Sequence, residues 1–262
     1  MNKIEEFALE IFSLDKGVQC KDIPEHHICL FCNKCREHLD DSIVYDFSRL
    51  NNYIDHTSLK ADARSGDINR MCEEWEMYKF KNICINPVFI SLALNHTFSI
   101  PICTVVGFPL GANTTEIKLI EAKNAIGLGA NEIDMVINIS ALKDKNYQYI
   151  LNEISQIAYL CTTNNVLLKV IIETCLLTED EIIMACLIAK KAGADFIKTS
   201  TGFSVKGAEI ESVRLIRRIV GNRIGVKASG GIKSRADALA MIEAGASRIG
   251  TSSSVSIMNE SL

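Results

Sequence analysis

Two lysines stand at the ends of short apolar stretches of this sequence. Lys198 closes "DFIK", with hydroxyl and glycine residues behind it, and Lys227 lies within "GVKASGG". Lysine is among the residue types that are least often buried, so these positions need an explanation. A lysine attacks a carbonyl carbon only as the neutral amine, and burial and a neighbouring ammonium group both favour that form. The pair indicates Schiff-base chemistry, whereas the simpler alternative is that each lysine snorkels or forms a salt bridge.

A carboxylate occupies a corresponding position in a third apolar stretch. Asp134 lies within "EIDMV", and an aspartate beside two lysines can donate and accept protons during a reaction. A single lysine would favour the structural alternative. Two lysines and an aspartate at equivalent positions favour a catalytic site.

Such a site requires elements that bring the three residues together. Eight short apolar stretches follow one another from Tyr53 onward, as expected of strands that are buried on both faces. They cover residues 53–55, 82–85, 102–106, 132–137, 167–172, 196–199, 224–228 and 248–250. Helical patterns lie between them. The clearest begins at Thr178, with Glu181 three residues later as a capping box, and ends at Gly193.

One helix-to-strand unit recurs as "GLGANEIDMV", "KKAGADFIKT" and "IEAGASRIGT". Its recurrence indicates a parallel sheet, and eight units predict an α/β fold of the (β/α)₈ TIM-barrel type over residues 49–262. A doubly wound open sheet is the alternative. In a TIM barrel, functional residues follow the carboxyl ends of the strands, so Lys198, Lys227 and Asp134 should meet at one mouth.

Glycine-rich turns follow the last two predicted strands. Gly230 and Gly231 lie in "ASGGI", and "GTSSS" contains Gly250, Ser252 and Ser253. Loops after strands seven and eight of this barrel commonly bind phosphate through backbone N–H groups, and glycine allows close approach. Ordinary turn and cap chemistry is the alternative. The position of both turns favours a phosphate site.

Composition restricts the possible partners. The chain has 262 residues, 48% of them hydrophobic, with a net charge of −4 and no basic block, so we expect no nucleic-acid partner. No apolar run of about 18 residues predicts a membrane span. The N-terminus has no basic region of the kind that begins a secretory signal. We therefore expect a cytoplasmic protein whose ten cysteines are reduced.

Metal and cofactor motifs are missing from the second part of the sequence. His56 and His96 are far apart, and no paired-cysteine or H-E-x-x-H spacing accompanies them. No G-x-G-x-x-G follows a predicted strand, so a nicotinamide cofactor is not indicated. We expect a covalent lysine mechanism without a metal or another cofactor.

Several long motifs resemble one known family. The stretches "IDHTSLKADA", "VVGFPLGANTTEIKLIEAKNAIGLGANEIDMVINI", "LKVIIET", "AGADFIKTSTGF", "GVKASGGI" and "RIGTSSS" are similar to those of deoxyribose-phosphate aldolases, which are class I aldolases on a TIM barrel. The resemblance implies reversible, metal-free cleavage of 2-deoxy-D-ribose 5-phosphate to D-glyceraldehyde 3-phosphate and acetaldehyde. Another phosphosugar aldolase or isomerase, or an inactive barrel used as a scaffold, remains an alternative.

The resemblance also implies roles for individual residues. Lys198 matches the Schiff-base lysine, Lys227 the second lysine and Asp134 the acid–base aspartate. Substrate contacts are expected from Asp55, Thr57, Cys84, Lys169, Thr201, Gly230, Gly231, Gly250, Ser252 and Ser253. Ser58 and Ser140 depart from the leucine and glycine that are usual in the family. We expect a homo-oligomer, either a dimer or a tetramer.

Residues 1–48 lie outside the resemblance. An apolar face predicts an amphipathic helix and consists of Ile4, Phe7, Ala8, Ile11 and Phe12. Ligand-like spacing relates Cys29, Cys32, Cys35 and His38, and zinc is possible there, although reduced thiols are the favoured interpretation. The extension could dock on the barrel, on a partner or in an enzyme microcompartment.

Overall fold

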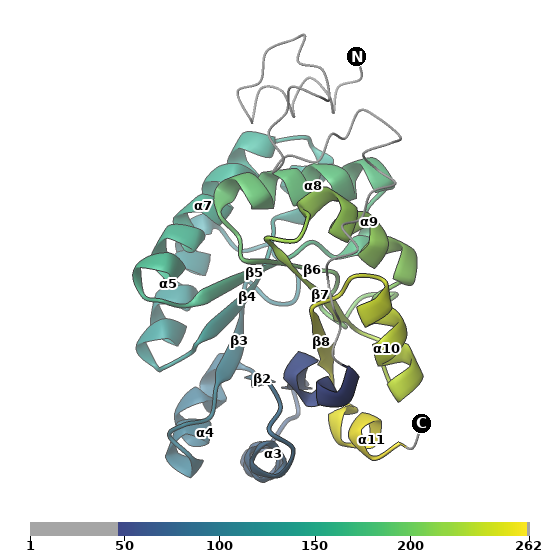
Figure 1. Cartoon of the computed structure of the whole chain (residues 1–262). Helices are drawn as coiled ribbons and strands as arrows, with labels where there is room; N and C mark the ends of the chain where they lie inside the picture. The colour runs from purple at the N-terminus through teal and green to yellow at the C-terminus, as the bar shows by residue number, and fades with distance from the viewer. Residues whose placement is uncertain (1–46, 261–262) are drawn as a thin grey trace.

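The computed structural model describes residues 47–260 of the chain. Eight parallel strands form a closed barrel in chain order (Figure 1). The barrel closes where β1 pairs with β8. The strands are β1 (Ile54–Ser58), β2 (Asn82–Ile85), β3 (Ile102–Val106), β4 (Glu132–Val136), β5 (Leu167–Ile171), β6 (Phe196–Lys198), β7 (Gly225–Ser229) and β8 (Arg248–Thr251). The predicted TIM barrel is confirmed, its eight strands lie where they were expected, and the open-sheet alternative is wrong.

Helices surround the barrel on its outer face (Figure 1). They are α3 (Ser65–Tyr78), α4 (Ile90–His96), α5 (Thr115–Gly127), α6 (Ile139–Lys143), α7 (Tyr147–Thr163), α8 (Glu179–Ala192), α9 (Ile210–Val220), α10 (Arg235–Glu243) and α11 (Ser254–Asn259). Short 3₁₀ turns span η2 (Phe47–Tyr53), η3 (Pro87–Phe89) and η4 (Thr174–Leu176). No helix within this part of the chain is long and apolar enough to cross a membrane.

Helix α8 shows how local sequence fixes the ends of an element. The Thr178 hydroxyl accepts the backbone N–H of Glu181 at 3.3 Å, and the Glu181 carboxylate accepts that of Thr178 at 2.8 Å. Gly193 ends the helix with φ 91°. This left-handed conformation is accessible to glycine at little cost. The predicted capping box and stop are confirmed.

Alternation along each strand divides the side chains between two environments. Ile133 and Met135 of β4 face outward into the main hydrophobic core between the strands and the helices. Glu132 and Asp134 of the same strand join the charged side chains inside the barrel. A small apolar group of Leu59, Cys84, Cys103 and Val105 is separate from the main core. Polar chemistry is therefore concentrated inside the barrel, and the apolar core holds the strands from outside.

Three predictions lie outside the described residues. They concern the amphipathic helix of residues 4–12, the ligand-like group of Cys29, Cys32, Cys35 and His38, and the docking role of residues 1–48. They stay predictions.

Candidate active site

A lysine and an aspartate meet at the bottom of the barrel mouth. Lys198 ends β6, and its Nζ donates to Asp134 Oδ2 at 2.7 Å. Lys198 is 2% exposed and Asp134 is fully buried. A short charge-assisted hydrogen bond of this kind fixes both side chains. The two residues are 64 positions apart in sequence, so only closure of the barrel brings them together.

The same aspartate holds two further lysines. Lys227 Nζ on β7 lies 2.8 Å from Asp134 Oδ2, and Lys169 Nζ on β5 lies 2.8 Å from Oδ1. Both lysines are fully buried. In the strand register Lys198 is paired with Lys227 and Asp134 with Lys169. Asp134 is thus the centre of a group of three ammonium side chains.

A second layer of charges lies behind this group. Asp55 Oδ2 is 2.6 Å from Lys227 Nζ, and Glu132 Oε2 is 2.5 Å from Lys169 Nζ. The Arg248 guanidinium bridges the two carboxylates, at 2.7 Å from Asp55 and 2.9 Å from Glu132. With Asp134 and Lys198, the cluster has four cations and three anions when every group is charged. Loss of one ammonium proton would balance it.

Electrostatics keep the deep members of the cluster ionised. Burial alone would raise the pKa of Asp134, but Lys169, Lys198 and Lys227 outweigh it and hold that pKa well below the ordinary range. Burial alone would lower the pKa of Lys227, yet Asp134 and Asp55 raise it well above its ordinary value. Asp134 therefore remains a carboxylate and Lys227 an ammonium group near neutral pH.

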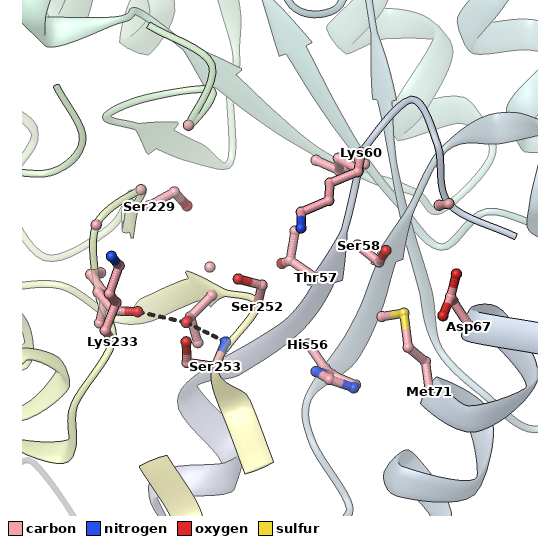
Figure 2. Close-up of a pocket in the computed structure, with 18 of the residues that line it drawn as sticks. His56, Thr57, Ser58, Lys60, Asp67, Met71, Ser229, Lys233, Ser252 and Ser253 are labelled. Carbon is pink, nitrogen blue, oxygen red and sulfur yellow. Dashed lines mark hydrogen bonds between the residues drawn. The ribbon is translucent and has the colours of Figure 1, made fainter. Parts of the chain in front are cut away.

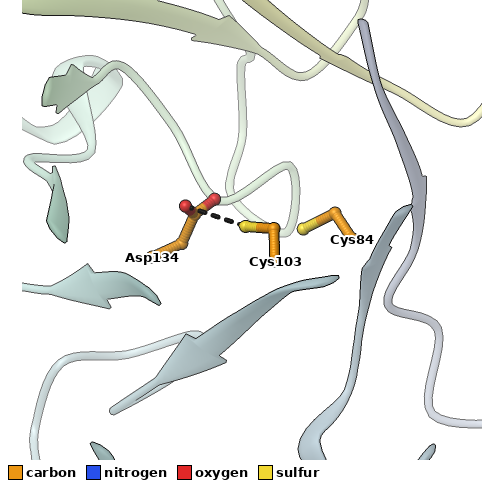
Figure 3. A group of neighbouring side chains, drawn as sticks. All are labelled: Cys84, Cys103 and Asp134. Carbon is orange, nitrogen blue, oxygen red and sulfur yellow. Dashed lines mark hydrogen bonds between the residues drawn. The ribbon is translucent and has the colours of Figure 1, made fainter. Parts of the chain in front are cut away.

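Two thiols lie near the carboxylate, with Cys103 between Asp134 and Cys84 (Figure 3). The Cys103 thiol donates to Asp134 Oδ1 at 3.1 Å, and Lys169 Nζ lies 3.2 Å from the same sulfur. A hydrogen bond with Cys103 and the nearby Lys227 ammonium together lower the pKa of Cys84 to about 7, although burial opposes them. Cys84, Cys103 and Asp134 have the spacing of a metal site. Lysine ammonium groups already supply the positive charge there, so this donor set does not favour a resident cation.

An open pocket of about 740 Å³ lies above the cluster (Figure 2). Of the three lysines around Asp134, Lys198 reaches its wall, whereas Lys169 and Lys227 lie deeper. Thr57 and Lys60 come from β1 and the loop after it. Ser229 and Ser252 come from β7 and the loop after β8, and Ser252 lies beside Thr57 in the view of Figure 2. A substrate in this pocket can meet the Lys198 amine directly.

The glycine turns form the part of the pocket wall that follows β7 and β8. Gly230 and Gly231 have φ 84° and 78°, a backbone conformation that favours glycine. A Cβ on Gly207 would lie 2.1 Å from the Gly230 carbonyl oxygen, so the turns after β6 and β7 touch through their backbones. Behind Ser252, the Ser253 N–H donates to Thr251 Oγ1 at 2.9 Å. Both turns border the pocket, and their binding of phosphate stays a prediction.

Thr201, in the loop after β6, is held by Glu173, which lies just beyond the end of β5. The Thr201 hydroxyl donates to the Glu173 carboxylate, and its N–H lies 3.2 Å from the same group. Glu173 has φ 55° and is buried. This contact ties the loop after β6, which follows Lys198, to the end of β5.

The predicted site residues separate into two layers. Those inside the barrel, fully buried, are Asp55, Cys84, Asp134, Lys169 and Lys227. Those lining the pocket are Thr57, Lys198, Thr201, Gly230, Gly231, Gly250, Ser252 and Ser253. Lys198 joins the layers because its ammonium group contacts Asp134. The structure adds Glu132, Arg248, Cys103, Glu173, Ser229, Lys60 and Lys233, which sequence reasoning did not select.

The fold and this site together define a class. A closed (β/α)₈ barrel that presents one lysine, paired with an aspartate, to a pocket at the carboxyl ends of its strands is the arrangement of a lysine-dependent aldolase. Comparison with known proteins gives the family. The chain belongs to the DeoC/LacD aldolase family, whose model matches residues 50–257.

Relatives with curated names share about half of their residues with this chain. Deoxyribose-phosphate aldolase of Streptococcus sanguinis is 52% identical over 212 residues, which cover 80% of this chain and 96% of that protein. Deoxyribose-phosphate aldolase of Carboxydothermus hydrogenoformans is 54% identical over 209 residues, which cover 78% and 92%.

Solved structures of deoxyribose-phosphate aldolases superpose on this chain. A putative deoxyribose-phosphate aldolase from Coccidioides immitis superposes with a TM-score of 0.81 at 34% identity, over 99% of this chain and 97% of that one. A tetrameric deoxyribose phosphate aldolase from Aeropyrum pernix superposes with a TM-score of 0.75 at 34% identity, over 80% and 89%.

Proposed function

We propose that this protein is a deoxyribose-phosphate aldolase, which cleaves 2-deoxy-D-ribose 5-phosphate reversibly to D-glyceraldehyde 3-phosphate and acetaldehyde. The observation that carries the proposal is the contact of 2.7 Å between Lys198 Nζ and Asp134 Oδ2, directly beneath the pocket. The names of relatives that are 52% and 54% identical support the choice of substrate.

Lys198 is the nucleophile in this proposal. It combines access to the pocket with membership of a cluster that has one positive charge in excess. Lys227 stays charged between Asp134 and Asp55, and Lys169 is held between Asp134 and Glu132. These two lysines keep Asp134 ionised, and Lys198 supplies the amine.

The reaction then proceeds through an imine. The neutral amine of Lys198 attacks the aldehyde carbon C1 of the open-chain sugar, and loss of water leaves a protonated imine. A base removes the proton of the C3 hydroxyl, the C2–C3 bond breaks, and its electrons move into the iminium to give an enamine. D-glyceraldehyde 3-phosphate leaves. Protonation of the enamine at C2 and hydrolysis release acetaldehyde and restore Lys198.

Asp134 transfers the protons in this proposal. Its Oδ2 is 2.7 Å from the amine that becomes the imine nitrogen and 2.8 Å from the charged Lys227. A carboxylate in this position can accept the C3-hydroxyl proton through a water or through Lys227 and return it to the enamine. Glu132, Arg248 and Asp55 would act as positioning residues, because they hold the lysines that surround Asp134.

The far end of the sugar would lie at the glycine turns. Gly230 and Gly231 leave the backbone open to an anion, and Ser252 and Ser253 border the same pocket. Thr57, Thr201 and Gly250 line the space between the two ends. Cys84 would shape the apolar space beside the imine. No cofactor is required by this chemistry.

The proposal extends to the assembled enzyme. We expect a homo-oligomer, either a dimer or a tetramer, and the tetrameric relative from Aeropyrum pernix supports this expectation. A cytoplasmic location and a docking role for residues 1–48, on a partner or in a microcompartment, remain parts of the proposal.

Trapping the imine tests the function. Borohydride added to the protein with 2-deoxyribose 5-phosphate should attach a stable adduct to Lys198, and a coupled assay should detect acetaldehyde. Lys198→Arg should give neither signal. Conversion of the sugar to an isomer without acetaldehyde would instead indicate an isomerase. Absence of both adduct and turnover would support the scaffold alternative.

A further inference from the structure

One buried hydroxyl on the pocket wall lacks a partner in the protein. Ser229 ends β7 and is 4% exposed, and its Oγ makes no hydrogen bond to any residue in 47–260. Buried polar atoms in folded proteins are nearly always hydrogen-bonded, so such an atom at a pocket indicates a ligand or a bound water. The resemblance to the family implied a role for the two glycines after this residue and none for the serine itself.

Three threonine hydroxyls around the pocket already donate within the protein. Thr57 Oγ1 donates to the Asp55 carbonyl at 2.7 Å, and Thr251 Oγ1 donates to the Ile232 carbonyl at 2.7 Å. The Thr201 hydroxyl donates to the Glu173 carboxylate. A hydroxyl has one hydrogen to donate, so these three threonines offer the substrate only lone pairs. Ser229 can offer its hydrogen without breaking a contact.

The position of Ser229 is fixed from two sides. Thr199 Oγ1 accepts the Ser229 N–H at 3.2 Å and lies 3.4 Å from the Ser229 carbonyl oxygen, and Thr199 directly follows Lys198. On the other side, a Cβ at Gly250 would lie 2.3 Å from Ser229 Oγ and 3.0 Å from Lys227 Cε. Glycine at 250 therefore leaves the space that the serine hydroxyl and the lysine chain share.

The position of Ser229 along the barrel axis indicates which substrate group its hydroxyl contacts. Ser229 lies two residues beyond Lys227 on the same face of β7, about 7 Å farther along the strand. Gly230 of the proposed phosphate turn follows it immediately. A sugar that is bound to Lys198 through C1 and to the turn through its phosphate must place its middle carbons beside Ser229. The C3 hydroxyl belongs to the proton transfer at Asp134, which leaves the C4 hydroxyl.

We propose that the Ser229 hydroxyl donates a hydrogen bond to the C4 hydroxyl of the substrate and thereby selects sugars that carry it. This inference rests on the proposed aldolase function. In the direction of synthesis, the same group is the C2 hydroxyl of D-glyceraldehyde 3-phosphate. Ser229 thus becomes a specificity-determining residue for the acceptor aldehyde.

The test compares two acceptors in the addition of acetaldehyde. One is D-glyceraldehyde 3-phosphate, and the other is 3-phosphooxypropanal, which has the same aldehyde and phosphate but no C2 hydroxyl. For Ser229→Ala, kcat/KM should fall about tenfold with the first acceptor and less than about twofold with the second. Ser229→Cys keeps the shape with a weaker donor, so it should show a selective loss in the same direction.

Ser247→Ala is a matched control. The Ser247 hydroxyl accepts the Val226 N–H at 3.1 Å before β8 begins, away from the pocket, so its loss should not change the ratio of the two acceptors. Equal losses with both acceptors, or no loss with either, in Ser229→Ala would overturn the inference. Wild-type protein that joins acetaldehyde to neither acceptor would instead refute the aldolase function on which the inference rests.

Discussion

Lys118 and Lys198 are both lysines that the fold removes from solvent, but their surroundings differ. Lys118 of α5 is fully buried outside the barrel, where its Nζ contacts Glu153 of α7 at 2.7 Å and the Val136 carbonyl at 2.8 Å. Glu153 in turn accepts the Asn138 N–H at 3.1 Å. This is a closed pair with one cation, one anion and no contact with the pocket.

The comparison shows that burial does not by itself make a lysine catalytic. Burial lowers the pKa of Lys118, although Glu153 opposes the change, and the amine still has nothing to attack. Lys198 shares its carboxylate with two other lysines and borders the pocket. Access and an excess of positive charge separate the two sites. A functional lysine is better recognised by these two features than by its burial.

Replacing the pocket lysine should have the largest effect. Lys198→Ala should lower the rate of 2-deoxyribose 5-phosphate cleavage by at least about 10³-fold, because no other amine of the cluster borders the pocket. Folding should survive, since Asp134 keeps Lys169 and Lys227 as partners. Acetaldehyde release and urea unfolding measure the two properties. Activity within tenfold of wild type would remove Lys198 from the mechanism.

Replacing the other lysine should have the opposite pattern. Lys118→Met leaves the Glu153 carboxylate buried without its cation, so the free energy of unfolding should fall by about 3–5 kcal/mol. The kcat of the folded fraction should change less than about tenfold. Urea unfolding and the coupled assay on the same preparation give both values.

A double variant controls for the charge left behind. Lys118→Met with Glu153→Leu removes both charges, and it should recover most of the lost stability, because apolar residues often replace a buried ion pair without cost. A double variant that is no more stable than Lys118→Met would show that packing, rather than the unpaired carboxylate, causes the loss.

The sequence predicted the strands and most strand-end residues because both depend on local pattern. Buried parallel strands are short apolar runs, and polar residues at their ends are conspicuous. Alternation would have extended the prediction. Glu132 precedes Asp134 by two residues, Arg248 precedes Gly250 by two, and Ser229 follows Lys227 by two. Each lies on the same inward face of its strand as a residue that the sequence predicted for the site. The two-residue period of a strand therefore indicates all three additional residues.

The Lys118–Glu153 pair had no such signal. Its members lie 35 residues apart on two helices, and charged residues in helices are usually solvated. The left-handed conformation of Glu173, at φ 55°, also could not be predicted from the sequence, because non-glycine residues rarely adopt it. Both features depend on how distant segments pack, which local pattern does not encode.

Lowering the pH should change the stability contributions of the two charged sites in opposite directions. This effect should be smaller than those of the lysine replacements. Burial would raise the pKa of Glu132, but Lys169 and Arg248 together outweigh it, and the pKa is lowered from its ordinary value of 4.5. Burial raises the pKa of Glu153 despite Lys118. A carboxyl with a lowered pKa binds fewer protons in the folded protein, so its contribution to stability is lost as pH falls below about 4.5. A carboxyl with a raised pKa contributes most below its unfolded pKa and loses that contribution as pH rises.

The stability difference between wild type and Glu132→Gln should therefore shrink from pH 6 to pH 3, whereas the difference for Glu153→Gln should grow. The change is about 1.4 kcal/mol for each unit of pKa shift. Urea unfolding of the three proteins across this range measures it. Differences that move in the same direction would mean that the barrel cluster and the outer pair respond to protons alike, and the electrostatic contrast between Lys198 and Lys118 would then reduce to access to the pocket alone.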